Sequence, residues 1–149
     1  MPNDLADRFD PDLAARLQNA GAASAGGLPA FLGVRITECS PGVLAASVDV
    51  TSPLLTPFGA AHGGVLAALV DHVLGAVCYP VIPRGAWAAT TEFKVNFLAP
   101  VREGVLEARA NIISLSRRTA VVRIEAHSND DLVGIAQGTV TIRPPSPPA

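Results

Sequence analysis

Apolar and polar side chains alternate through most of the second half of the chain. Every second side chain is apolar over residues 92–97, 106–112 and 121–127, and residues 132–142 form a further apolar-rich run. A period of two places alternate side chains on opposite faces of a strand, which is typical of an antiparallel sheet with one buried face. The pattern therefore predicts four consecutive strands.

The first half has a different pattern. Two strand-like runs, residues 31–39 and 43–50, flank the turn sequence Ser40-Pro41-Gly42 and predict a β-hairpin. Residues 63–79 are rich in Ala and Leu and are followed by Pro80, which indicates a long helix. Because this helix is apolar nearly all round, it must be enclosed. The sequence thus predicts an α+β fold in which a curved antiparallel sheet wraps one central helix.

We divide the chain into three segments on these patterns. Residues 1–29 form an amphipathic N-terminal helix, interrupted by Pro11, and a hinge of Gly, Ala and Ser at 21–29. Residues 30–143 form the single main domain. Residues 144–149 are a proline-rich tail that cannot pair as a strand.

Composition excludes several functions. The chain has 149 residues, a formal net charge of -2 and no basic cluster beyond Arg117-Arg118, so we expect no binding of nucleic acid. Asp71 and His72 lie in the middle of the most apolar stretch, which favours a core helix over a membrane span, and we expect no membrane partner. With 49% hydrophobic and only 16% charged residues, we expect a homo-oligomer, a dimer or tetramer.

Cysteine and histidine positions bear on metals and on the compartment. Cys39 and Cys78 lack the spacing of a zinc site or a disulfide framework, and the histidines are scattered, so we expect no metal. The first ten residues carry acids where a signal peptide needs a basic start and an apolar run. We therefore expect a cytoplasmic protein, where thiols stay reduced.

The candidate chemistry lies where the long helix begins. His62 precedes Gly63 and Gly64, and glycine there lets a ligand approach the backbone closely. The first N–H groups of a helix lack intrahelical partners and suit an oxyanion. Asp71 follows two turns later among small and apolar neighbours, where a carboxylate needs a partner or a chemical role. Each feature alone also fits a structural role. The glycines fit the geometry of a turn, and Asp71 fits a structural carboxylate whose hydrogen bonds are satisfied within the fold.

His62-Gly63-Gly64, Asp71 and the segment TTEFKVNFLAP at 90–100 together resemble the phenylacetic-acid-degradation-type (PaaI-like) acyl-CoA thioesterases, over roughly residues 31–143. The resemblance implies the hotdog fold and hydrolysis of an acyl-CoA substrate by a homo-oligomer. No separate cofactor is implied, since coenzyme A is part of the substrate.

The resemblance also implies a role for individual residues. The backbone N–H of Gly63 would polarise the thioester carbonyl, and Asp71 would act as general base or as nucleophile. A hydroxyl from the facing subunit, Thr90 or alternatively Thr91, would position the acid or the water. His62 would either hold the loop or contact the thioester.

Three further residues match a binding loop of that family. The turn at 114–119 resembles its coenzyme A phosphate-binding loop, which makes Arg117, Arg118 and Thr119 candidate phosphate contacts; a solvated hairpin turn fits the same sequence.

One position departs from the family pattern. Thr56 stands where many members have Asn, and its single hydroxyl cannot reproduce the reach and two donors of an amide. A non-hydrolytic acyl-CoA binding or sensing module is therefore the alternative function. A hotdog dehydratase fits poorly, because those enzymes pair a catalytic His with an acid in a different local motif.

Overall fold

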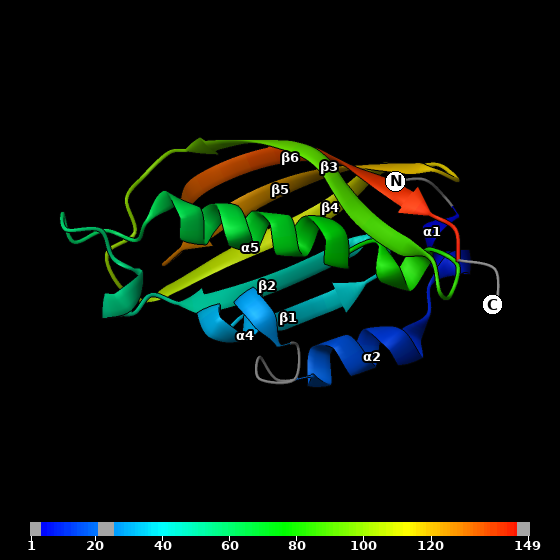
Figure 1. Cartoon of the computed structure of the whole chain (residues 1–149), viewed down its shortest axis with the longest axis horizontal. Coiled ribbons are helices and arrows are strands. Elements are labelled where there is room, and N and C mark those ends of the chain that lie inside the picture. Colours follow the sequence, from blue (N-terminus) through cyan, green and yellow to red (C-terminus); the bar gives the residue numbers. More distant parts are fainter. Residues whose placement is uncertain (1–3, 21–25, 146–149) are drawn as a thin grey trace.

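In the computed structural model, which describes residues 4–20 and 26–145, six antiparallel strands form one curved sheet around a long helix (Figure 1). The strand order is β1-β2-β4-β5-β6-β3. The strands are β1 (Arg35–Ser40), β2 (Val43–Asp49), β3 (Trp87–Phe97), β4 (Val105–Leu115), β5 (Thr119–Ser128) and β6 (Asp131–Arg143). The helices are α1 (Leu5–Arg8), α2 (Pro11–Asn19), α4 (Gly27–Leu32) and α5 (Gly63–Ala76), with 3-10 turns at Ser52–Leu54 and Tyr79–Val81. This is the predicted hotdog architecture.

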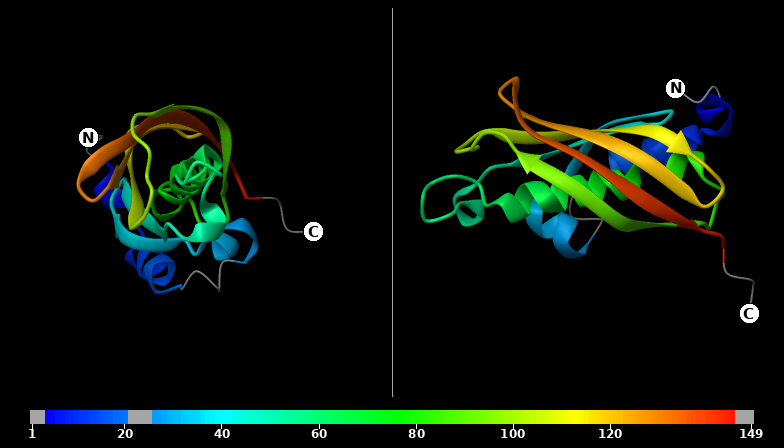
Figure 2. Two further views of the ribbon diagram at one scale, coloured as in Figure 1. Left: turned by 90° about the vertical axis from the view of Figure 1, so that its left-hand side faces the viewer. Right: turned by 90° about the horizontal axis from the view of Figure 1, so that it is seen from above.

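Helix α5 is the centre of the core. Seen end-on, the sheet wraps around it (Figure 2), and the side chains of Leu69, Val73 and Leu74 are completely buried against the sheet. The run from Gly63 to Val81 is long and apolar enough to cross a membrane by length and composition, but most of it is buried inside this fold. It therefore has the burial expected of a core helix.

Two glycines of β6 let the helix and the neighbouring strand approach closely. A Cβ atom on Gly138 would lie 2.6 Å from the Glu92 carbonyl oxygen of β3 and 2.9 Å from a methyl group of Leu74 on α5. A Cβ atom on Gly134 would lie 2.8 Å from a methyl group of Leu66. Side chains at these two positions would displace α5 or β3, so the glycines set how closely the helix packs on the sheet.

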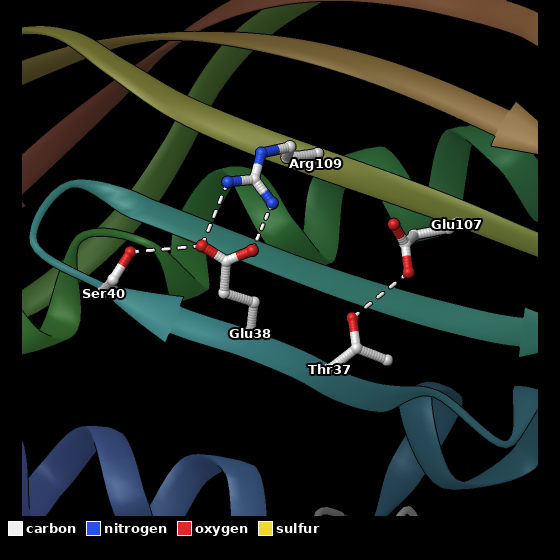
Figure 3. A network of polar contacts seen from close by, with 5 residues as sticks. All are labelled: Thr37, Glu38, Ser40, Glu107 and Arg109. Carbon is white, nitrogen blue, oxygen red and sulfur yellow. Dashed lines mark hydrogen bonds and ion pairs between the residues drawn. The ribbon is translucent and has the colours of Figure 1, made fainter. Parts of the chain in front are cut away.

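An ion-pair network ties three strands together on the side of the sheet away from β3 (Figure 3). Arg109 of β4 reaches across β2 and donates two hydrogen bonds to the Glu38 carboxylate of β1. Ser40 also donates to Glu38, at 3.3 Å, and Thr37 donates to Glu107 at 3.3 Å. The hydrogen bonds from Arg109 hold the pKa of Glu38 below its ordinary value and raise that of Arg109.

The N-terminal helix is interrupted at Pro11, as predicted. Asp10 accepts a hydrogen bond from the Leu13 N–H at 3.0 Å and so caps α2, with Pro11 in its first turn. Asp10 also pairs with Arg84 at 2.8 Å and donates its backbone N–H to the Pro80 carbonyl at 2.7 Å. These contacts fasten the N-terminal helices to the loop that leads into β3.

Some predicted boundaries are wrong. Residues 27–32 form helix α4, whereas the sequence pattern placed hinge residues up to 29 and a strand from 31. The helix ends where Gly33 adopts a left-handed conformation, so the first strand starts only at Arg35. The domain boundary drawn at residue 30 thus falls inside α4. The remainder of the hinge, 21–25, and tail residues 146–149 lie outside the described residues.

Strand β3 begins earlier than expected, and α5 ends earlier. The strand starts at Trp87 rather than at residue 92, and the helix stops at Ala76 before the 3-10 turn that contains Pro80. Because β6 is the only strand among the described residues that pairs with β3, the other side of β3 is an edge of the described sheet over eleven residues.

Candidate active site

Two depressions lie along α5. The first, of about 340 Å³, surrounds the start of the helix and is called here the Gly63 depression. The second, of about 460 Å³, lies between the later turns of α5 and the start of β3 and is called here the Asp71 depression. The Gly63 depression is lined by Ala60, Ala61, His62, Gly63, Leu66, Phe97, Leu98, Ala99, Pro100, Val101 and Leu106. The Asp71 depression is lined by Asp71, His72, Gly75, Ala76, Tyr79, Trp87, Ala88, Ala89 and Thr90.

His62 caps the helix at the Gly63 depression. Its Nδ1 accepts a hydrogen bond from the Gly64 N–H at 2.8 Å, which requires an unprotonated Nδ1. A Cβ atom on Gly64 would lie 2.9 Å from that same nitrogen, so the glycine makes room for the cap. Of the two roles open to His62 from the sequence, the structure shows the one that holds the loop and helix together.

The Gly63 N–H makes no hydrogen bond to any described residue. It belongs to the first residue of α5, where the partial positive charge of the helix dipole is concentrated. The Gly63 α-carbon faces the Phe97 ring, since a Cβ atom there would lie 3.2 Å from it. The Gly63 N–H is therefore a backbone donor at a depression with largely apolar surroundings.

Asp71 and Thr90 lie together at the second depression. Asp71, on α5, is exposed in this chain, and Thr90, on β3, is half-buried. None of the residues lining the depression is Lys or Arg, so no cation among them compensates the carboxylate. Burial lowers the pKa of His72, and the charge of Asp71 only partly opposes this, so the imidazole is mainly neutral at pH 7.

A single chain does not bring Gly63 and Asp71 together. They are eight residues apart on one helix, which separates them by about 12 Å at 1.5 Å per residue. Thr90, by contrast, was expected to come from the facing subunit, yet it lines the same depression as Asp71 within one chain. Thr91 occupies a bulge of β3, and its hydroxyl lies 2.6 Å from that of Thr141.

The Thr56 side chain is half-buried and does not line the Gly63 depression. Its backbone closes a tight loop, because its N–H donates to the Ala60 carbonyl at 2.7 Å and its carbonyl accepts from the Gly59 N–H at 2.9 Å. In this chain Thr56 is therefore part of the loop that leads to His62, and its hydroxyl is not placed beside the Gly63 N–H.

The turn between β4 and β5 holds the candidate phosphate contacts. Ser116 Oγ accepts hydrogen bonds from the N–H groups of Arg118 at 3.3 Å and Thr119 at 3.0 Å, which fixes the turn. The side chains of Arg117, Arg118 and Thr119 are exposed. Thr119 is paired with Thr141, and Thr141 with Ala89 in the wall of the Asp71 depression. The turn thus lies two strands from that depression.

The two cysteines are poor candidates for the reacting group. Burial raises the pKa of the Cys78 thiol to about 12, and its Sγ donates to the Leu74 carbonyl at 3.8 Å. Burial and the neighbouring Glu38 also raise the pKa of Cys39. Because the thiolate is the nucleophilic form, neither cysteine is activated. Within the described residues, no group of three or more His, Cys, Asp or Glu side chains is arranged to hold a metal ion.

Two large residues of the Asp71 depression, Tyr79 and Trp87, were not predicted from the sequence. Gly75 follows Asp71 by four residues and was expected as its neighbour on the helix, and Tyr79 follows by four more, so the same spacing is the signal that would have placed it there. Trp87 is 57% exposed, and the Arg143 guanidinium lies over its ring, 5.8 Å from the centroid. Trp87 went unnoticed because β3 starts five residues earlier than expected.

Comparisons with known proteins agree with this geometry. A family model described as the thioesterase superfamily matches residues 58–135, more than half of the chain. A 1,4-dihydroxy-2-naphthoyl-CoA hydrolase of Listeria monocytogenes is 26% identical over 118 residues, covering 78% of this chain and 96% of that protein.

Solved structures extend the comparison to the fold. The crystal structure of a thioesterase from Haemophilus influenzae superimposes with a TM-score of 0.78 at 26% identity, over 85% of this chain and 89% of that one. A mutant of the phenylacetic acid degradation protein PaaI from Thermus thermophilus gives a TM-score of 0.69 at 32% identity, and the match covers 75% of this chain and 95% of that one. The family match and the shared fold confirm the resemblance drawn from the sequence, and the chain belongs to the thioesterase superfamily.

Proposed function

We propose that this protein hydrolyses an acyl-CoA thioester with a small or medium acyl group, aromatic groups included. The observation that carries the proposal is the exposed, uncompensated carboxylate of Asp71 beside Thr90, on the same helix whose first N–H, that of Gly63, is free to bind an oxyanion. The Listeria relative, by its name, acts on an aromatic acyl-CoA.

The chemistry requires both groups. As water or a carboxylate adds to the thioester carbonyl, negative charge develops on the carbonyl oxygen, and a preorganised N–H such as that of Gly63 stabilises it. Losing one such donor costs about 2.7–4 kcal/mol in a comparable acyl-transfer site. As a base, Asp71 takes a proton from the attacking water, the carbon–sulfur bond breaks, and coenzyme A leaves as the thiol after taking up that proton. As a nucleophile, Asp71 displaces coenzyme A to form an acyl–Asp71 anhydride, which water then hydrolyses to the free acid and the regenerated carboxylate, while the thiolate takes a proton from that water. We propose that Thr90, which lines the same depression as Asp71, orients the carboxylate or the water.

Since Gly63 and Asp71 lie about 12 Å apart on one helix, we propose that a second copy of the chain completes each site. The free edge of β3 offers unpaired backbone groups to such a copy, and the exposed side chains of Trp87, Phe97 and Leu98 lie at its two ends. A dimer, or a tetramer built from two dimers, is expected by light scattering. A fully active monomer at assay concentration would contradict the shared site.

We also propose that Arg117, Arg118 and Thr119 bind the phosphates of coenzyme A and that the enzyme needs no cofactor. Thr56 does not line the Gly63 depression and stands where many family members have Asn, which supports the alternative function, an acyl-CoA binding or sensing module without turnover. Incubation with acetyl-, hexanoyl- and benzoyl-CoA, with detection of the released thiol, separates the two functions. Thiol release is expected. Saturable binding of these acyl-CoAs without release of the thiol would establish the binding module instead.

A further inference from the structure

Gly75 is the one glycine inside α5 that no neighbour in the described structure explains. A Cβ atom built on it meets nothing within 4 Å outside the backbone of its own helix, and its φ angle is not in the left-handed region. Gly64, by contrast, makes room for the His62 cap, and Gly63 faces the Phe97 ring. An alanine would fit at position 75 without strain.

A glycine in the interior of a helix is less favourable than alanine, because it loses more conformational freedom on folding. Gly75 therefore weakens α5 with no compensating contact from the described residues that face it. The empty space beside it is part of the Asp71 depression, one helical turn beyond the carboxylate. The surrounding wall is formed by Ala76, Tyr79 and the small side chains of Ala88 and Ala89.

We propose that Gly75 keeps this space open for the acyl group of the substrate and so sets the largest acyl group that the enzyme accepts. The inference rests on the proposed function and adds a specificity-determining residue to it. The wall is mainly apolar and open beside Gly75, so it fits a medium-chain or aromatic acyl group better than an acetyl group, which would leave the space unfilled.

The test uses the full chain and two substitutions of graded size. Gly75→Ala adds one methyl group, and Gly75→Leu fills the space. Ala67→Leu is the matched control, because it adds a leucine to the same helix at a half-buried position that lines neither depression. For each variant, kcat/KM is measured on acetyl-, hexanoyl- and benzoyl-CoA, together with the melting temperature and the molar mass by light scattering.

We expect Gly75→Leu to lower the ratio of kcat/KM for hexanoyl- or benzoyl-CoA to that for acetyl-CoA by at least about tenfold, the scale of discrimination that a few methylene groups give in a pocket. Gly75→Ala should lower the ratio less and raise the melting temperature by about 2 °C, because it only improves the helix. Ala67→Leu should leave the ratio unchanged.

An unchanged substrate ratio, dissociation of the oligomer, or no binding of the three acyl-CoAs would each overturn the inference. An unchanged substrate ratio in Gly75→Leu would show that the space does not hold the acyl group, while wild-type turnover would still support the proposed function. Dissociation of the oligomer in Gly75→Leu would show that a second copy fills the space. If the wild type releases no thiol, the same ratio is measured from dissociation constants by calorimetry. If it binds none of the three acyl-CoAs, the proposed function and this inference fall together.

Discussion

The Gly63 and Asp71 depressions divide between them the groups that the proposed reaction needs. The Gly63 depression has a backbone donor at the positive end of a helix and no acid among the residues that line it, with His62 already used as a cap. The Asp71 depression has an exposed carboxylate and a neighbouring hydroxyl but no Lys or Arg in its lining. A helix is rigid, so it holds the two groups about 12 Å apart, and the proposed reaction therefore requires a second copy to bring complementary ends to one carbonyl.

The largest expected effect comes from removing the acid of the Asp71 depression. Asp71→Asn should lower kcat by about 10²-fold or more, because it removes the base or nucleophile at nearly constant size. Stability should change by less than about 0.5 kcal/mol, since the side chain is exposed and no described residue donates to it. The two are measured on one preparation as steady-state turnover and thermal unfolding.

Asp131→Asn is the control for that experiment, because it makes the same chemical change at an exposed carboxylate outside the Asp71 depression. It should leave turnover intact. An Asp71→Asn variant that is active but unstable would assign Asp71 a structural role. The Asp71 depression would then not supply the acid of the reaction.

The next largest effect is expected at the turn between β4 and β5, where we propose that the phosphates of the substrate bind while its thioester reaches the depressions. Arg117→Ala combined with Arg118→Ala should raise KM for acyl-CoA substrates by about tenfold, the scale of one charge-assisted hydrogen bond, with kcat little changed. Thioesters that lack the nucleotide should be unaffected. Arg123→Ala removes an exposed arginine on the adjacent strand and is the control. Equal losses on both substrate types would argue against phosphate binding at this turn.

A smaller effect is expected from the cap at the Gly63 depression. His62→Ala leaves the Gly64 N–H without its acceptor and should destabilise the fold by about 1 kcal/mol, the typical value of a helix cap. This corresponds to a fall in melting temperature of about 2–4 °C for a chain of this size. His62→Asn can accept the same hydrogen bond and should recover most of the loss. If Asn recovers stability but not turnover, His62 also contacts substrate.

The smallest effect lies far from both depressions, in the Glu38–Arg109 pair. Because the folded-state pKa of Glu38 lies below its ordinary value, the pair stabilises the fold above the unfolded pKa of about 4.3. That contribution disappears as the pH falls through the lower folded-state value. Both side chains are partly exposed, so solvent screening limits it to below about 1 kcal/mol.

Chemical denaturation at pH 7 and at pH 3 measures this pH dependence. Glu38→Gln should reduce stability at pH 7 and leave it nearly unchanged at pH 3, with turnover intact at pH 7. An effect of this substitution on turnover would mean that the sheet far from α5 influences the site.

The local patterns of the sequence were sufficient for most elements. Alternation located β4 and β5, an apolar-rich run after a turn located β6, and Pro11 placed the break between α1 and α2. Residues 63–79 are apolar nearly all round, which predicted an enclosed helix, and His62-Gly63-Gly64 marked the start of α5. The failure at residues 27–34 is instructive, because Phe31, Leu32 and Val34 read as a strand, whereas Phe31 is 77% exposed on helix α4. A short apolar run fits either period.

Only the tertiary structure decided how the candidate residues relate to one another. Sequence period fixes the face of its own element on which a side chain lies, but it does not say which element covers that face. Because β3 pairs with β6 at the sheet edge, Thr90 lies beside Asp71 in one chain and the space beside Gly75 stays open. Strand order is set by packing between segments far apart in sequence, and it is this non-local packing that left Asp71 exposed. The separation of Asp71 from the Gly63 donor, by contrast, follows from their spacing along one helix.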